Sequence, residues 1–73
     1  MPLKPLSYCK VTRKLEAAGF QVVTQKGSHI KFAKETPEGR RTAIVPNYKE
    51  ITIGTISSIL RQAGLSVDEF ENL

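Results

Sequence analysis

Two turn signals divide the middle of this chain into three β-rich segments, and this pattern constrains the fold more than any other feature. Gly27 separates residues 20–25 from residues 28–34, which predicts a β-hairpin. The stretch Thr36-Pro37-Glu38-Gly39 has proline and glycine where a type I turn prefers them, and a third strand at about Arg41 to Val45 follows it. Three consecutive strands joined by short turns predict an antiparallel meander.

The apolar residues of the first hairpin predict its register. Phe20, Val22 and Thr24 share one face of a strand, and Phe32 needs the same face. We therefore expect Phe20 opposite Phe32, with Gln25-Lys26-Gly27 as a three-residue loop whose glycine takes a left-handed conformation. A two-residue loop would place Phe20 and Phe32 on opposite faces, so it is not expected.

The second hairpin is predicted by the same reasoning. The expected pairs are Phe32 with Ala43, Ile30 with Val45 and His29 with Pro46. Because proline cannot donate a ladder hydrogen bond, the third strand should lie at an edge of the sheet. In this register, His29 and Lys31 point to the uncovered face.

Helices are predicted on both sides of the meander, and each has its own start and stop signals. The first covers 7–18, begins at Ser7, ends before Gly19 and has an apolar face of Tyr8, Val11, Leu15 and Ala18. The second covers about 53–63, begins at Thr52, ends at Gly64 and has an apolar face of Ile53, Ile56, Leu60 and Ala63. Ser66-Val67-Asp68-Glu69 is a capping box, flanked by Leu65 and Phe70, for a short terminal helix.

These elements predict an α+β fold: a three-stranded antiparallel sheet with helices on one face, the other face open, and a short C-terminal helix. The 73 residues are expected to form a single domain, 1–73. A chain of this length buries only about 60% of its unfolded surface, so we expect a partner to add to its thin core.

Several classes of protein are excluded by composition. No apolar run approaches the roughly 20 residues that cross a bilayer, so we expect a soluble, cytoplasmic protein without a membrane contact. One cysteine, Cys9, makes no internal disulfide, and with a single histidine it cannot complete a zinc site. We expect no metal and no small-molecule cofactor.

Positive charge is concentrated in the first two thirds of the chain. Residues 1–49 carry ten Lys and Arg against three Glu, a net charge of +7, whereas residues 50–73 carry a net charge of −3. This distribution is typical of a nucleic-acid binder, although small soluble proteins are often mildly basic without binding anything. Lys10, Arg13 and Lys14 form one basic run, on the polar face of the first helix.

His29 is the chain's only histidine and its principal candidate for catalysis. Imidazole has an ordinary pKa of about 6.5 and so exchanges protons near neutral pH. His29 follows Gly27-Ser28, where exposed N–H groups would accept a phosphate oxygen, and it lies between Lys26 and Lys31. Such a group suits cleavage of RNA by its own 2′-hydroxyl. The alternative is that a lone histidine on a strand is merely solvated or structural.

A single histidine leaves the second proton-transfer role to Lys, Tyr, water or the substrate. The expected register places Asn47 and Tyr48 near His29, so Tyr48 is an auxiliary candidate. Its alternative role is that of a partly buried aromatic residue at the sheet edge. Ser28 has no arranged base, and Cys9 is interpreted as a small packing residue.

The chain resembles the HicA toxins of HicA/HicB toxin-antitoxin pairs over about residues 12–70. The resemblance rests on Gly19-Phe20, Gln25-Lys26-Gly27-Ser28-His29, Ile30-Lys31-Phe32, Val45-Pro46-Asn47, Ile53-Gly54-Thr55-Ile56, Ser58 to Leu65 and Glu69-Phe70. The Gly-Ser-His step is weak by itself, but together with Gln62-Ala63-Gly64-Leu65 it is fairly specific. Many members carry a further histidine after the Val-Pro step, where this chain has Asn47-Tyr48.

The resemblance implies a fold like the double-stranded RNA-binding domain and an mRNA endoribonuclease that arrests translation. It implies His29 as the catalytic residue and a HicB antitoxin bound over the active site. Our leading hypothesis is a metal-independent RNase toxin in which His29 transfers the proton and cations hold phosphates. The expected nucleic-acid-binding residues are Lys10, Arg13, Lys14, Lys26, Gly27, Ser28 and Lys31. The alternatives are a non-catalytic RNA-binding module and a protein that only docks an acidic partner.

Overall fold

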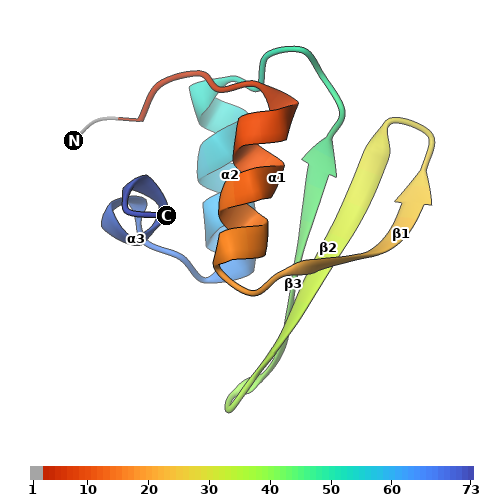
Figure 1. Ribbon diagram of the computed structural model, residues 1–73, viewed down its shortest axis with the longest axis vertical. Coiled ribbons are helices and arrows are strands. Elements are labelled where there is room, and N and C mark those ends of the chain that lie inside the picture. Colours follow the sequence, from red (N-terminus) through yellow and green to blue (C-terminus); the bar gives the residue numbers. More distant parts are fainter. Residues whose placement is uncertain (1–2) are drawn as a thin grey trace.

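The computed structural model describes residues 3–73 and has the expected order of elements, with three strands between helices. The elements are α1 (Tyr8–Ala17), β1 (Gln21–Lys26), β2 (His29–Thr36), β3 (Gly39–Pro46), α2 (Ile53–Ala63) and α3 (Val67–Glu71). The sheet is antiparallel with strand order β1-β2-β3, so β3 is an edge strand as predicted. Both α1 and α2 lie on one side of the sheet, and α3 lies on the far side of the helices from the strands (Figure 1).

The helix boundaries follow the local signals read from the sequence. The Ser7 hydroxyl accepts a hydrogen bond from the Lys10 N–H at 3.3 Å, which begins α1. Thr52 caps α2 in the same way, and Gly64 ends it in the left-handed conformation with φ +73°. Ser66 and Glu69 form the predicted capping box of α3.

The core lies between the two longer helices and the inner face of the sheet. Its buried members are Val11, Leu15, Phe20, Ile30, Phe32, Ala43, Val45, Ile51, Ile56, Ile59, Leu60, Ala63 and Phe70. Ile53 was expected on the apolar face of α2, but it is 44% exposed because it begins the helix, one turn before the buried stripe. Ile59, absent from the predicted stripe, is buried.

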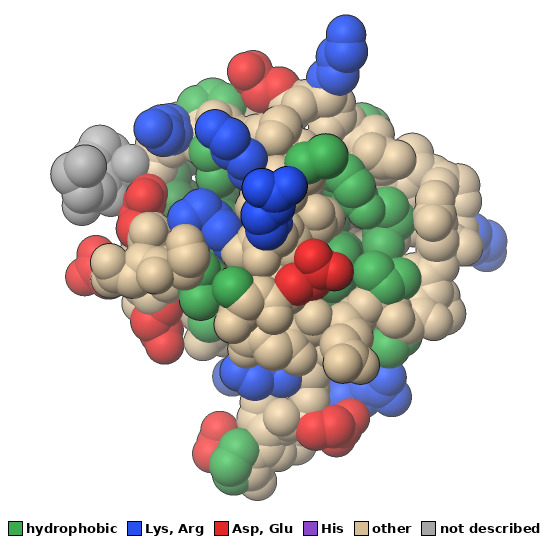
Figure 2. Space-filling view, viewed as in Figure 1, with side chains coloured by type: hydrophobic (Ala, Val, Ile, Leu, Met, Phe, Trp, Pro, Cys, Tyr) green, Lys and Arg blue, Asp and Glu red, His purple; other side chains and the backbone are tan. Residues whose placement is uncertain are grey.

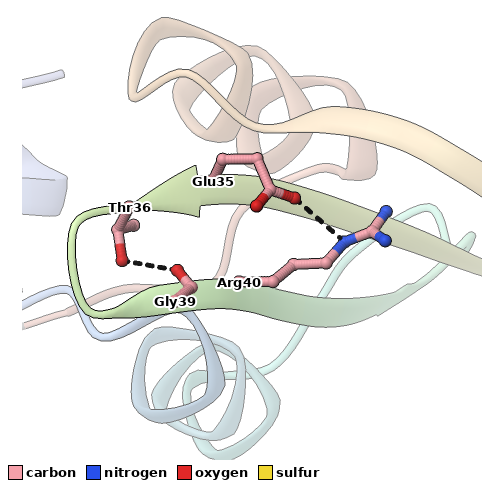
Figure 3. A network of polar contacts seen from close by, with 4 residues as sticks. All are labelled: Glu35, Thr36, Gly39 and Arg40. Carbon is pink, nitrogen blue, oxygen red and sulfur yellow. Dashed lines mark hydrogen bonds and ion pairs between the residues drawn. The ribbon is translucent and has the colours of Figure 1, made fainter.

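The register of the second hairpin is confirmed. Phe32 pairs with Ala43, Ile30 with Val45 and His29 with Pro46. At its turn, the Thr36 hydroxyl donates to the Gly39 carbonyl at 2.6 Å, and Arg40 lies 3.5 Å from Glu35 across the strands (Figure 3). Both charged side chains are largely exposed, so this ion pair contributes little to stability. The turn extends beyond the helices, away from the core (Figure 1).

The predicted register of the first hairpin is wrong. Lys26 pairs with His29, which leaves Gly27-Ser28 as a two-residue loop. Gly27 has a φ of +62° and Ser28 does not have a positive φ, as in a type II′ turn. With this loop, a regular ladder would turn Phe20 toward the solvent. A β-bulge between Val22 and Thr24 adds one residue to β1 and so returns Phe20 to the core face.

The bulge also changes which β1 residues face the solvent. Thr24 was expected beside Val22 on the core face, but its partner is Lys31, which points away from the core. Val22 pairs with buried Phe32 yet is 53% exposed. The reason is that the helices pack against β3, whereas β1 forms the opposite edge and is exposed along its whole length.

Candidate active site

The loop of the first hairpin places His29 on the open face of the sheet. Ile30 and Phe32 of β2 are buried in the core, so the alternating His29 and Lys31 face the opposite side, and both are exposed. Lys26 is the cross-strand partner of His29, and Thr24 is the partner of Lys31. The two lysines expected beside the histidine thus lie on its own face.

These side chains line one hollow of about 510 Å³ on the open face, formed by Thr24, Lys26, His29, Lys31 and Ile44. The exposed lining is mostly carbon, with the ammonium groups of the lysines as its positive charge. Ile44 comes from β3, where it is the cross-strand partner of Lys31. The hollow therefore combines one imidazole, two cations and an apolar surface.

The turn between β1 and β2, beside the hollow, is held by a hydrogen bond from the end of the edge strand β3. The Asn47 N–H donates to the Ser28 carbonyl at 2.6 Å, which joins the turn to the end of β3. Neither the Gly27 nor the Ser28 N–H donates to a backbone carbonyl within residues 3–73. These two donors are therefore free of backbone partners, and a phosphate oxygen is a suitable acceptor for them.

The basic run on α1 does not belong to this hollow. Lys10, Arg13 and Lys14 line a separate hollow of about 250 Å³ together with Ala17 and Leu73. Because Val11 and Leu15 of α1 are buried in the core, α1 covers the inner face of the sheet and its basic side points away from it. Lys and Arg side chains gather over α1 in Figure 2, and no histidine is seen on that face.

Lys14 is already engaged by the C-terminal segment. Its ammonium donates to the Phe70 carbonyl at 3.1 Å and to the Leu73 carbonyl at 3.2 Å. It also lies 5.2 Å from the centre of the Phe70 ring. These contacts hold α3 against α1, so a phosphate would have to compete with them for Lys14.

Tyr48 lies in the loop after β3 and is 53% exposed. It lines a third hollow, of about 380 Å³, together with Ser7, Tyr8, Cys9, Asn47 and Lys49. In this hollow, burial raises the pKa of the Tyr8 phenol above its usual value, and the nearby ionisable Cys9 and Glu16 raise it further. The structure thus brings Asn47 to the histidine turn through its backbone, while the Tyr48 side chain faces a different hollow.

Two residues of the hollow around His29 were not among the predicted site residues. Ile44 could have been found, because its neighbours Ala43 and Val45 are inward-facing and a residue between them must point outward. Thr24 could not, because its orientation depends on the bulge before it.

No group of three or more His, Cys, Asp or Glu side chains among residues 3–73 is arranged to hold a metal ion. In the same range, none of the helices has the length and apolar character needed to cross a membrane.

Comparison with known proteins identifies the family. No curated protein matches the chain. The family model described as the HicA toxin of bacterial toxin-antitoxin systems matches residues 8–65, which extend from the first residue of α1 to just beyond α2. This match covers most of the 73 residues and includes the histidine turn and the whole sheet. The chain therefore belongs to the HicA family of toxins.

Proposed function

We propose that this toxin is a metal-independent endoribonuclease that cleaves mRNA in the cytoplasm, with His29 as the catalytic residue. The observation that carries the proposal is the hollow on the open sheet face, in which His29 lies with Lys26 and Lys31. An exposed imidazole next to two ammonium groups suits a reaction that moves a proton beside a phosphate. We also propose that residues 1–73 form a single domain.

The chemistry would proceed by attack of the 2′-oxygen of the RNA on the adjacent phosphorus. A new bond forms between phosphorus and the 2′-oxygen, and the bond to the 5′-oxygen breaks, which leaves a cyclic phosphate and a free 5′-hydroxyl. One proton leaves the attacking hydroxyl and one reaches the leaving oxygen. His29 would carry one of these transfers, and a lysine or water would carry the other, because the Tyr48 side chain lines a different hollow.

Negative charge accumulates on the phosphate oxygens during this reaction. Lys26 and Lys31 would stabilise it from either side of His29, together with the N–H groups of Gly27 and Ser28. We do not assign Lys10, Arg13 and Lys14 to the same RNA strand, because α1 covers the inner face of the sheet and its basic side points away from the hollow around His29.

The experiment that tests this function is incubation of wild-type protein and His29→Ala with a long single-stranded RNA in EDTA, read on a denaturing gel. We expect cleavage by wild type only, no cleavage of the same strand with 2′-deoxyribose, and RNA binding by both proteins. Intact RNA with folded wild-type protein would instead favour the non-catalytic RNA-binding module. Equal cleavage by both proteins would exclude His29 as the catalytic residue.

We further propose a HicB-like antitoxin as the partner that covers this hollow. An acidic partner would hide His29 and neutralise Lys26 and Lys31 at once, so antitoxin and RNA would compete for one surface. Lys26→Glu should then weaken both associations, measured separately by titration. An unchanged affinity for either ligand would argue against a shared surface.

A further inference from the structure

The open face of the sheet carries an exposed apolar side chain that the proposed chemistry does not use. Ile44 is 45% exposed and lies across from Lys31, inside the hollow that contains His29. A proton-transfer site for a phosphate needs cations and donors, but it has no need of an exposed isoleucine. At this position the isoleucine gives the hollow an apolar surface, beside the two lysines, that a ligand can cover.

We propose that Ile44 forms the floor of a subsite for an unpaired nucleobase next to the phosphate held by Lys26 and Lys31. The position of the scissile bond beside this subsite rests on the proposed function, whereas the binding of the base to Ile44 does not. It specifies the substrate as single-stranded RNA, although the fold resembles that of double-stranded RNA-binding domains.

The shape and polarity of the hollow support a nucleotide as its occupant. A volume of about 510 Å³ lies within the usual range for small-molecule sites. Its lining is mostly carbon, whereas the charge is positive and comes from the two lysine ammonium groups. A nucleotide has the complementary construction, with a flat apolar base and a negatively charged phosphate, and stacking on a protein surface tolerates any base.

The backbone at Ile44 is held in a way that keeps this floor in place. The Ile44 N–H faces the outer edge of β3 and donates to the Gln62 side-chain oxygen of α2 at 3.1 Å. Two residues on, Pro46 has no N–H to offer. An added β-strand would need these edge donors, so this edge is poorly suited to pairing with another strand.

Duplex RNA does not offer what this subsite requires. In a duplex the base faces are stacked and only their edges are accessible, so Ile44 would meet sugar and phosphate. In a single strand a base can turn out of the stack and lay its face on the isoleucine while its phosphate reaches the lysines.

The test measures the binding of short fluorescent RNA oligomers that carry 2′-O-methyl groups and so cannot be cleaved by their own 2′-hydroxyl. Ile44→Ala and Ile44→Thr are compared with wild type, and Ile53→Ala is the matched control. Ile53 is the same residue type, is 44% exposed and does not line the hollow. We expect Ile44→Ala to weaken single-strand binding about tenfold. Ile53→Ala should change it by less than about twofold.

A second oligomer in which the bases are removed tests the chemistry of the contact. Wild type should bind this abasic strand weakly, and Ile44→Ala should weaken it no further. Ile44→Thr retains a β-branched side chain suited to a strand, so it separates loss of the contact from loss of the fold. Melting temperatures close to that of wild type verify that each variant is folded.

Three results would overturn the subsite. They are single-strand binding that is unchanged in both Ile44 variants, equal loss for the intact and the abasic strand, and duplex RNA bound as tightly as single-stranded RNA. Failure of the subsite is separable from failure of the nuclease. Wild type that cleaves RNA with no dependence of binding on Ile44 refutes only the subsite, whereas Ile44-dependent binding without cleavage refutes only the nuclease.

Discussion

The salt dependence of RNA binding distinguishes the two cationic surfaces of this molecule. Lys26 and Lys31 line the hollow on the open sheet face, whereas Lys10 and Arg13 line the hollow beside α1. Each phosphate contact with a single strand contributes about −0.7 to the slope of log affinity against log salt. Two contacts on the sheet face therefore predict that Lys26→Gln with Lys31→Gln makes the slope shallower by about 1.4.

The assay is fluorescence anisotropy of a single-stranded RNA titrated with protein between about 50 and 200 mM salt, the range over which such contacts are clearly lost. A slope difference of 1.4 over this range means that the advantage of wild type over the double variant shrinks about sevenfold. The matched control is Lys10→Gln with Arg13→Gln, which removes the same charge. All four side chains are exposed, so neither double variant should change the fold.

We expect the α1 variant to keep the slope of wild type, because an RNA strand on the open face does not reach the far side of the helices. An equal loss of slope in both variants would mean that RNA passes around the molecule and contacts both surfaces. A loss in the α1 variant alone would refute the placement of RNA on the sheet face.

Three further predictions concern stability. Phe70→Ala should lower the free energy of unfolding, measured by urea denaturation, by about 3–5 kcal/mol, since Phe70 is 1% exposed. Val67→Ala on the same helix removes part of a side chain that is 37% exposed and should lower it by less than about 1 kcal/mol. Gly64→Ala should cost about 1–2 kcal/mol in thermal melts because Gly64 has a φ of +73°, and Gly64→Asn should cost less; equal costs would contradict the backbone explanation. A hydrogen bond from the Ser66 N–H holds the pKa of Glu69 below its usual value. The stabilisation from the Glu69 charge is therefore present above the unfolded pKa and is lost as pH falls through the folded pKa. The stability advantage of wild type over Glu69→Gln should shrink in acid, and a constant difference would refute the assignment.

The local elements were predictable because their causes are local. Ser7, Thr52 and Ser66 each cap the helix that follows, and Gly64 ends α2 with an α-left conformation that only a few residues adopt readily. The predicted register of the second hairpin was correct because Ile30 and Phe32 have apolar partners on β3 at matching positions and the turn between these strands is short.

The first hairpin was mispredicted because its register depends on an irregularity. A type II′ turn at Gly27-Ser28 suits the twist of the sheet, but with a regular ladder it would turn Phe20 to the solvent. The bulge removes this conflict, at the cost of one unpaired residue in an edge strand. No residue near Val23 is a specific signal for a bulge, so periodicity alone favoured the three-residue loop.

The order of the elements, the open-face position of His29 and Lys31, and the resemblance to the HicA toxins were predictable from the sequence, and the family match confirms the resemblance. These follow from alternation along one strand and from short motifs. Only the folded core placed Thr24 beside the histidine and turned the basic side of α1 away from the hollow around it. Burial of Phe20 in the core requires the bulge in β1, and burial of Val11 and Leu15 sets the side on which α1 packs. Both depend on core residues from distant segments, so the neighbouring residues do not encode them.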